Sequence, residues 1–404
     1  MNEPKLRFKA DDGSQFPDWE EKTLGDIGTA KMCKRVLKEQ TSEKGDVPFY
    51  KIGTFGGTPD AFISRELYEE LKTKYSFPRK GNILLSAAGT IGRTVVYDGQ
   101  DAFFQDSNIV WLDNDDSVLD GFLLQFYNKT SWDNLEGGTI KRLYNGLFLS
   151  KVIHVPSLPE QQKIAEFLST IDTVIEKQKE TVSAWEERKK GVMQKLFSQE
   201  VRFKADDGSE FPEWENVTVL DLLVQPITDG PHETPVLEEN GVSFVSVEAI
   251  DNGRVNLTKR RGFISKEYDN VCAKKYKPRL YDVYMVKSGA TTGKVAIVTI
   301  TDDFNIWSPL AAMRTSSKTE AFFLYYQLQS DMIQNQVWTK LSLGNQPNLG
   351  MRALELFSAV RPCLAEQQKI VDCLSSLDEV IETQKATLSA WEELKKGLLQ
   401  QMFV

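Results

Sequence analysis

The chain contains two phrases twice, and this repetition limits the folds it can adopt more than any other feature. Residues 160–197 recur as 366–403 with 24 of 38 positions identical, and residues 7–19 recur as 202–214 with 11 of 13 identical. The phrases are offset by 206 and 195 residues respectively, so the second block between them is 11 residues longer than the first. Such a unit is far longer than a solenoid repeat. We therefore expect a duplicated domain joined to a duplicated helix.

The order of the phrases is cyclic. The central copy of the long phrase continues through Val201 into Arg202, whereas the final copy ends at Val404. Joining Val404 to the residues that precede Arg7 would regenerate the central junction. Near termini are common in single domains, and the duplication gives a further reason for them here. We expect the termini to lie close together and the two halves to be related by a pseudo-twofold axis.

The long phrase has the spacing of a coiled-coil seam. Apolar residues recur at alternating intervals of four and three positions, as in Ile164, Leu168, Ile171 and Ile175, and the second copy repeats the pattern. About five such heptads predict a helix roughly 57 Å long in each copy. We expect the two helices to pair as an antiparallel coiled coil.

Polar and aromatic residues inside the seam bear on its register. Gln178 and Gln384 lie at the middle of the two predicted helices, and Trp185 and Trp391 follow one heptad later. In an antiparallel pair with twofold symmetry the two glutamines would meet, and a single polar seam residue fixes register at some cost in stability. The alternative is that each glutamine only tolerates partial exposure.

The blocks between the repeated phrases are typical of mixed strands and short helices. Runs rich in β-branched and aromatic residues, such as 82–86 and 283–286, are bounded by Gly, Asp and Asn, which predicts strands. The predicted fold class is α+β, with two similar α+β domains separated by two long α-helices. The predicted limits are a repeat segment at 1–19, a first domain at 20–157, a long helix at 158–200, a repeat segment at 201–214, a second domain at 215–363 and a final long helix at 364–404.

Charge and composition narrow the class of protein. The formal net charge is −9, yet the first block holds 17 basic and 19 acidic residues and the second block holds 16 of each. Phosphate binding needs a basic face rather than a basic protein. No apolar run approaches the roughly 20 residues that span a bilayer. Four scattered cysteines and two histidines argue against a metal site and fit a cytoplasmic protein with reduced thiols.

The chain shows no catalytic motif in a recognisable context. Residues 288–295 (SGATTGKV) resemble a phosphate-binding loop, but three residues separate the glycines and the motif ends in Lys-Val, which fails the required spacing. We expect a tight turn between two strands there. The acidic residues and lysine at 18–22 are too crowded for a nuclease site, and the absence of Pro-Pro excludes the amino-methylation motif. We expect no catalytic residue and no bound metal.

Basic runs and turn-forming loops in the two blocks are the candidate DNA contacts. A single basic run is more often a solvated face than a binding site, so the prediction depends on the concentration of such runs in the variable blocks. Arginine can pair with guanine, and Asn or Gln can pair with adenine. The candidates are Lys31, Lys34, Arg35, Arg93, Lys141, Arg142, Asn145, His232, Lys259, Arg260, Arg261, Lys294, Asn345, Gln346 and Asn348.

The start of the long phrase identifies a family. Residues 158–164 read LPEQQKI and residues 364–370 read LAEQQKI, each after a divergent block. With this motif and the cyclic duplication, essentially the whole chain resembles the specificity (HsdS) subunit of type I restriction-modification systems. Segments 81–93 and 229–235 are also similar to target-recognition-domain motifs of that family. The one departure, Ala365 where the first copy has Pro159, affects only how the helix begins.

This resemblance implies a function for each part. Each block would be a target recognition domain that reads one half of a bipartite site in double-stranded DNA, and the paired helices would set the spacing. One such subunit would bind two methyltransferase subunits, which methylate adenine N6, and up to two restriction subunits. S-adenosylmethionine, ATP and magnesium would be bound by these partners, and no cofactor would be bound by this chain.

Two other interpretations stay open on the residues alone. A coiled-coil scaffold that joins two protein-binding domains predicts no DNA binding even with partners present. An enzyme with a phosphate-binding loop predicts hydrolysis of ATP or GTP by the isolated chain. The DNA-specificity interpretation predicts neither catalysis nor strong specific binding by the chain alone.

Overall fold

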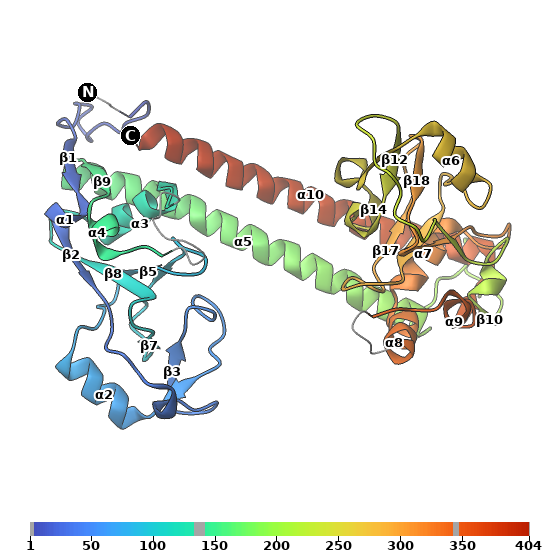
Figure 1. Cartoon of the computed structure of the whole chain (residues 1–404), viewed down its shortest axis with the longest axis horizontal. Coiled ribbons are helices and arrows are strands. Elements are labelled where there is room, and N and C mark those ends of the chain that lie inside the picture. The colour runs from blue at the N-terminus through green and yellow to red at the C-terminus, as the bar shows by residue number, and fades with distance from the viewer. Residues whose placement is uncertain (1–3, 133–141, 342–346, 404) are drawn as a thin grey trace. The chain divides into compact units, whose positions relative to one another are not determined.

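The computed structural model describes residues 4–132, 142–341 and 347–403. The chain divides into two compact units. The first contains residues 1–180 and 386–404, and the second contains residues 181–385. Each unit therefore holds one domain together with half of each long helix (Figure 1).

The first unit is built on three small sheets. Among the strands of its described residues, β3 and β7 pair in parallel and the other neighbours are antiparallel. In spatial order the sheets are β1 (Glu20–Thr23) and β9 (Val152–Val155); β2 (Gly28–Lys31), β8 (Ile109–Asn114), β5 (Ile83–Ser86) and β6 (Thr94–Val96); and β4 (Phe62–Ile63), β3 (Val47–Tyr50) and β7 (Phe103–Phe104). The helices are α1 (Leu24–Ile27), η1 (Lys38–Gln40), α2 (Arg65–Lys74), α3 (Asp120–Lys129) and α4 (Asn145–Leu149).

The second unit repeats this plan. Its sheets are β10 (Glu215–Thr218) and β20 (Ser358–Arg361); β11 (Thr228–Asp229), β19 (Leu310–Met313), β16 (Val283–Val286), β17 (Val295–Ile297), β14 (Arg254–Val255) and β13 (Ile250–Asp251); and β15 (Gly262–Ile264), β12 (Val242–Val245) and β18 (Phe304–Ile306). Its helices are η2 (Leu220–Leu222), η3 (Val247–Ala249), η4 (Leu257–Lys259), α6 (Lys266–Ala273), α7 (Ala321–Gln329), α8 (Asp331–Lys340) and α9 (Met351–Glu355). The predicted α+β class is confirmed.

In the described strands, the second plan differs from the first by an added hairpin. Strands β13 and β14 lie between β12 and β15, and β14 pairs with the edge strand β17 in parallel. In the first unit the corresponding connection, from β3 to β4, is residues 51–61. The hairpin extends the four-stranded arrangement of the first unit to six strands in the second. It accounts for part of the extra length of the second block.

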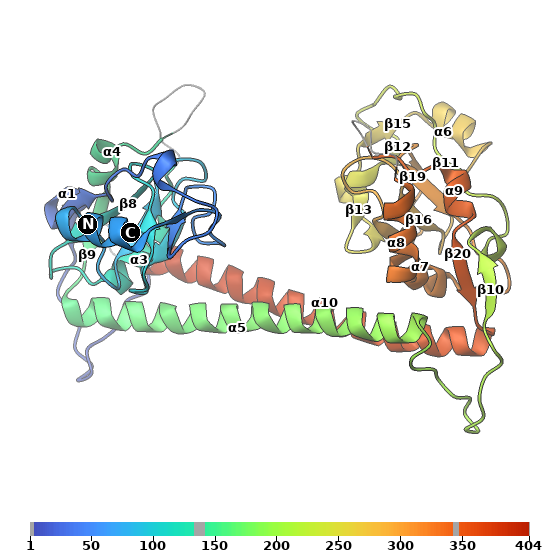
Figure 2. The ribbon, with the colours of Figure 1, turned by 90° about the horizontal axis from the view of Figure 1, so that it is seen from below.

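The long helices are α5 (Leu158–Phe197) and α10 (Leu364–Met402). In the first unit the beginning of α5, with Leu168, shares a core with the end of α10, with Leu399. In the second unit the end of α5, with Leu196, shares a core with the beginning of α10, with Leu374. Figure 1 and Figure 2 both show the helices side by side within each unit. The predicted antiparallel orientation is confirmed.

A lysine at a seam position pairs across the helices in each unit. Lys189 donates to Asp378 Oδ1 at 2.6 Å in the second unit, and Lys395 pairs with Asp172 in the first. Each aspartate also accepts a hydrogen bond from the domain that packs on the helices. These polar pairs fix the helix register within each unit. Gln178 belongs to the first unit and Gln384 to the second, so their contact stays a prediction.

The same carboxylate, partly exposed in each unit, also connects the helices to the domain: Asp172 contacts α3 and Asp378 contacts α7. Gln125 Nε2 donates to Asp172 Oδ2 at 3.0 Å, and the Tyr326 hydroxyl donates to Asp378 Oδ2 at 2.7 Å. Gln125 is buried on α3 and Tyr326 is buried on α7. The same contact is therefore made by different side chains in the two units.

The two repeated phrases contact each other, which explains why they recur together. Glu160 is fully buried at the start of α5, where its carboxylate accepts from Arg7 at 2.8 Å and from the Trp19 indole at 3.1 Å. In the second unit Glu366 accepts from Arg202 at 2.9 Å and from the Trp214 indole at 2.8 Å. Burial of a carboxylate is costly unless such partners satisfy it. The phrases therefore form one structural clamp, present twice.

The glutamine that follows this glutamate forms a second part of the clamp. Gln161 Oε1 accepts from the backbone N–H of Leu119 at 2.8 Å, and its Nε2 donates to the carbonyl of Pro156 at 2.9 Å. Gln367 makes the same contacts with Glu320 and Pro362, both at 2.8 Å. The amide thus holds the first turn of the domain helix against the first turn of the long helix.

The predicted cyclic junction is also visible in hydrogen bonds. Within the second unit the N–H of Val201 donates to the carbonyl of Lys195 at 3.2 Å. Within the first unit the N–H of Leu6 donates to the carbonyl of Gln401 at 3.0 Å. These are equivalent contacts, one inside a continuous segment and one between segments from the two ends of the chain.

Within the described ranges, no helix combines the length and the hydrophobicity that a membrane span requires.

Candidate nucleic-acid interface

Three loops from distant parts of the sequence meet at one end of the main sheet in the second unit. The loop between β16 and β17 closes when the N–H of Val286 donates to the carbonyl of Lys294 at 2.8 Å. It contacts residues 347–349, because the N–H of Gly289 donates to the carbonyl of Pro347 at 3.0 Å. The third loop, 229–235, is joined to it by an ion pair between Asp229 and Lys287. Residues 288–294 therefore form a turn between antiparallel strands, as predicted.

The first unit brings equivalent segments together. The N–H of Leu143 donates to the carbonyl of Ala87 at 2.9 Å, and Ala88 forms a β-bridge with Arg142. Gly92 in the turn between β5 and β6 has a φ of +88°, and an added Cβ would lie 2.2 Å from Cδ1 of Trp132. Glycine is therefore required at this position. In both units the β-turn and the segment before α4 or α9 form one surface.

Three of the predicted cations sit in these loops and are held by backbone carbonyls. Arg93 donates to the carbonyl of Phe55 at 2.7 Å, and Lys294 donates to the carbonyl of Ile250 at 2.6 Å. Arg142 donates to the carbonyl of Ser107 at 2.6 Å. A guanidinium has five donors and an ammonium has three, so such a contact leaves further donors on each group. Their role in DNA contact stays a prediction.

The basic run after η4 packs against aromatic rings. The guanidinium of Arg260 lies 4.2 Å from the ring centroid of Phe263, and that of Arg261 lies 4.2 Å from the ring of Trp307. The preceding Lys259 pairs with Asp251 at 2.9 Å. An arginine stacked on an aromatic ring loses little further freedom when it binds a planar or charged group.

The remaining candidates are distributed between exposed and undescribed positions. Lys34 is exposed with its ammonium 4.6 Å from the ring centroid of Tyr75. His232 is at the tip of loop 229–235, with 72% of its side chain exposed. Lys31 is the last residue of β2 and half-buried, whereas Arg35, Asn145 and Asn348 are exposed. Lys141, Asn345 and Gln346 lie outside the described residues.

Three residues at this surface were not predicted as contacts. Trp307 carries Arg261 and donates its indole N–H to the carbonyl of Glu233 at 3.1 Å. Lys275 and Lys287 both pair with Asp229. The basic run at 274–279 was visible in the sequence, but its pairing depends on strand register that only the folded sheet defines.

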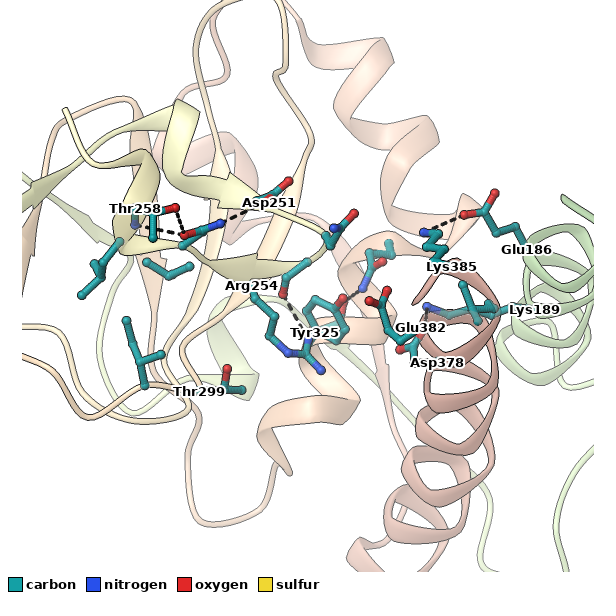
Figure 3. A pocket seen from close by; sticks show the side chains of 18 of the residues that line it. Glu186, Lys189, Asp251, Arg254, Thr258, Thr299, Tyr325, Asp378, Glu382 and Lys385 are labelled. Carbon is teal, nitrogen blue, oxygen red and sulfur yellow. Dashed lines mark hydrogen bonds and ion pairs between the residues drawn. The ribbon is translucent and has the colours of Figure 1, made fainter. Parts of the chain in front are cut away.

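The structure also contains a cavity of about 670 Å³ inside the second unit. It lies between the β13–β14 hairpin and the two long helices, with Arg254 and Tyr325 from one side and Lys189 and Asp378 from the other (Figure 3). The Arg254 guanidinium lies 5.4 Å from the ring centroid of Tyr325. The lining residues include neither histidine nor cysteine.

Comparison with known proteins identifies the architecture. The sequence profile described as type I restriction modification DNA specificity domain matches twice, over residues 17–183 and 213–391. A putative type I restriction enzyme specificity subunit of Haemophilus influenzae is 56% identical over 152 residues, which are 37% of this chain and 40% of the relative. The type I restriction enzyme MjaVIII specificity subunit of Methanocaldococcus jannaschii is 25% identical over 97% of this chain and 94% of its own length.

Solved structures show the same fold. The S subunit of a type I restriction-modification system from M. genitalium superposes with a TM-score of 0.56 over 100% of this chain and 99% of that chain, at 15% identity. A chain from a study of complex assembly in the type I R-M system superposes with a TM-score of 0.52 at 17% identity, over 96% of this chain and 97% of its own. The two profile matches, which together cover most of the sequence, place the chain in the family of type I restriction-modification DNA specificity subunits.

Proposed function

We propose that this chain is the sequence-recognition subunit of a type I restriction-modification complex and that each unit reads one half of a bipartite DNA site. The observation that carries the proposal is the duplication of a whole recognition surface. Two domains of matching topology present equivalent loops, and each is fixed to the helices by the same Glu-Gln clamp. Divergent loops on a repeated frame are what two different half-sites require.

The helices set the distance between the half-sites in this proposal. An extra helical turn adds about 5 Å, which corresponds to one or two base pairs along B-DNA. The same helices would dock two methyltransferase subunits, which would bind S-adenosylmethionine and methylate adenine N6. Up to two restriction subunits, with ATP and magnesium, would complete the assembly in the cytoplasm. The chain itself would be non-catalytic, and base flipping would belong to the methyltransferase.

The negative net charge of this chain fits this division of roles. Phosphate contacts dominate the affinity of most DNA-binding proteins, yet this chain has a formal net charge of −9. The partners can supply part of the charge that the phosphates need. We therefore expect weak DNA binding by the isolated chain and specific binding by the complex with methyltransferase subunits.

Co-expression with the methyltransferase subunit tests the proposal. Adenine methylation mapped across a genome should show one split motif, with two short half-sites and a fixed gap. Replacement of residues 20–157 by the corresponding block of another specificity subunit should change one half of that motif and leave the other unchanged. A scaffold without DNA recognition would give no motif, and this result would overturn the proposal.

A further inference from the structure

A buried ion cluster closes the end of β11 in the second unit. Asp229 is fully buried. One carboxylate oxygen pairs with Lys275, and the other lies 3.1 Å from Nε2 of His232 and 3.3 Å from Nζ of Lys287. Removing a carboxylate from water costs several kcal/mol unless nearby cations offset it. The cluster is therefore a feature that needs an explanation beyond packing.

Strand register identifies the equivalent positions in the first unit. Trp111 on β8 faces Lys31 on β2, and Ala312 on β19 faces Thr228 on β11. Trp111 and Ala312 also face the second residue of the neighbouring strand, β5 or β16. They are therefore equivalent, and so are the residues opposite them.

The first unit builds this corner without charges. Met32 follows Lys31, so it takes the place of Asp229. Ala87 follows β5 and takes the place of Lys287, which follows β16. Ala87 is buried in the apolar core of the first unit, and Met32 is partly buried and packs against that core. The fold therefore does not require the charged pair, and its presence in one unit points to recognition rather than to stability.

The loop attached to the cluster is held on both sides of its tip. A Cβ on Gly230 would lie 1.8 Å from the carbonyl oxygen of Ile306, so the loop passes directly against that strand end. The carbonyl of Glu233 accepts from the indole N–H of Trp307 at 3.1 Å. Between these points His232 projects from the surface, and its Nε2 faces Asp229. Of the ring's two nitrogens, Nδ1 is not engaged by this contact with the carboxylate.

We propose that Asp229 is a positioning residue for the half-site read by the second unit. It orients the imidazole of His232 and the ammonium of Lys275 toward the DNA, which they contact at the base edges beside the loop. The first unit, with Met32 at this position, orients its contacts by other means. This inference rests on the proposed function. It states that one carboxylate, that of Asp229, holds loop 229–235 in the conformation that reads DNA.

The test uses the complex with methyltransferase subunits and compares three variants with the wild type. Asp229→Met with Lys287→Ala installs the apolar pair of the first unit, and His232→Ala and Lys275→Ala each remove one oriented group. Dissociation constants are measured for duplexes that carry the mapped site, the site with the first half scrambled and the site with the second half scrambled. The first half-site is thus a control within each variant.

We expect the double variant to lose about tenfold or more of its discrimination against the scrambled second half, corresponding to about 1.4 kcal/mol, and to retain its discrimination in the first half. Its melting temperature should stay close to that of the wild type. His232→Ala and Lys275→Ala should each reproduce part of the loss. Since both side chains are largely exposed, these variants decide the matter even if the double variant does not fold.

Two results would overturn the inference. One is a folded double variant with full discrimination in the second half, because Asp229 would then serve only to neutralise Lys287. The other is unchanged discrimination in both single variants. Failure of the proposed function looks different, since the wild-type complex would then discriminate neither half-site.

Discussion

The two units share one frame but differ in the side chains behind their loops, which are apolar in the first unit and charged in the second. Both place a β-turn against the segment before α4 or α9 at one end of a sheet, and both lock the domain to the helices through a buried glutamate. The first unit fills the corner behind its loops with Met32 and Ala87, whereas the second uses Asp229 and Lys287. The frame is therefore held constant while the surface that faces a ligand varies. Under the proposed function, this separation would let one fold read two different half-sites.

The largest expected effect tests whether the clamp is equivalent in the two units. Glu160→Ala and Glu366→Ala should each destabilise their own unit by about 3 kcal/mol, because each removes the partner of a largely buried arginine and leaves an indole N–H without its acceptor. Calorimetry of thermal unfolding measures the loss of stability in each of the two variants. A large loss in one variant and none in the other would show that the two clamps are not equivalent.

Substitution of the β-turn glycine should destabilise the two units to different degrees. Gly92→Ala places a Cβ against the rigid ring of Trp132, whereas Gly293→Ala meets the end of the Gln334 side chain at 2.9 Å. Both glycines have positive φ, at +88° and +94°. We expect a loss of about 2 to 3 kcal/mol for Gly92→Ala and about 1 kcal/mol for Gly293→Ala. Urea titration measures the difference, and equal losses would contradict this account of the first turn.

The seam lysines provide a finer test of the helix pair. Lys189→Met removes the cross-helix partner of Asp378, which still accepts a hydrogen bond from the Tyr326 hydroxyl. Lys395→Met removes the partner of Asp172, which still accepts a hydrogen bond from the Gln125 amide. We expect a loss of about 1 to 2 kcal/mol in each case. Because the Asp172 side chain is 36% exposed and that of Asp378 is 24% exposed, water solvates Asp172 better, and Lys189→Met should cost slightly more. Adding Asp172→Leu or Asp378→Leu should recover most of the loss, and chemical denaturation of the four variants measures this.

The smallest effect concerns the start of the domain helix. Burial raises the pKa of Asp120 above its usual value, and the equivalent position in the second unit is Ala321. A carboxyl group with a raised folded pKa makes the protein less stable as pH rises through the unfolded and then the folded pKa. Asp120→Asn should therefore raise stability by less than about 1 kcal/mol at pH 7 and have no such effect near pH 3. A melting-temperature series against pH gives the comparison.

The repeated frame was predictable because its signals are local. Heptads predicted α5 and α10, and runs rich in β-branched and aromatic residues predicted β5 and β16. The cyclic order predicted that the two ends of the chain lie close together, and the hydrogen bond between Leu6 and Gln401 agrees with it. The domain limits and the contacts of the candidate DNA-binding residues stay predictions. The register of the helices was attributed to glutamines, whereas Lys189 and Lys395 supply cross-helix pairs within the units.

The charged corner at Asp229 was not predictable. Its partners lie 46 and 58 residues away in sequence, Lys275 just after α6 and Lys287 just after β16, and only the folded arrangement of β11, β19 and β16 brings them together. The same holds for Trp307, which carries Arg261 and anchors the loop at Glu233. Sequence periodicity defines which face of a strand is buried, but it does not define which distant loop reaches its end.

The most direct test of the central claim is a chain that carries the first domain twice. Residues 215–363 are replaced by residues 20–157 while both long helices are kept, and the chimera is expressed with the methyltransferase subunit for genome-wide mapping of adenine methylation. Because the helices are antiparallel, two equivalent reading domains should recognise the same half-site twice in inverted order, which gives a palindromic motif with a fixed gap. A folded chimera that methylates no motif, or that keeps the wild-type second half-site, would contradict the account.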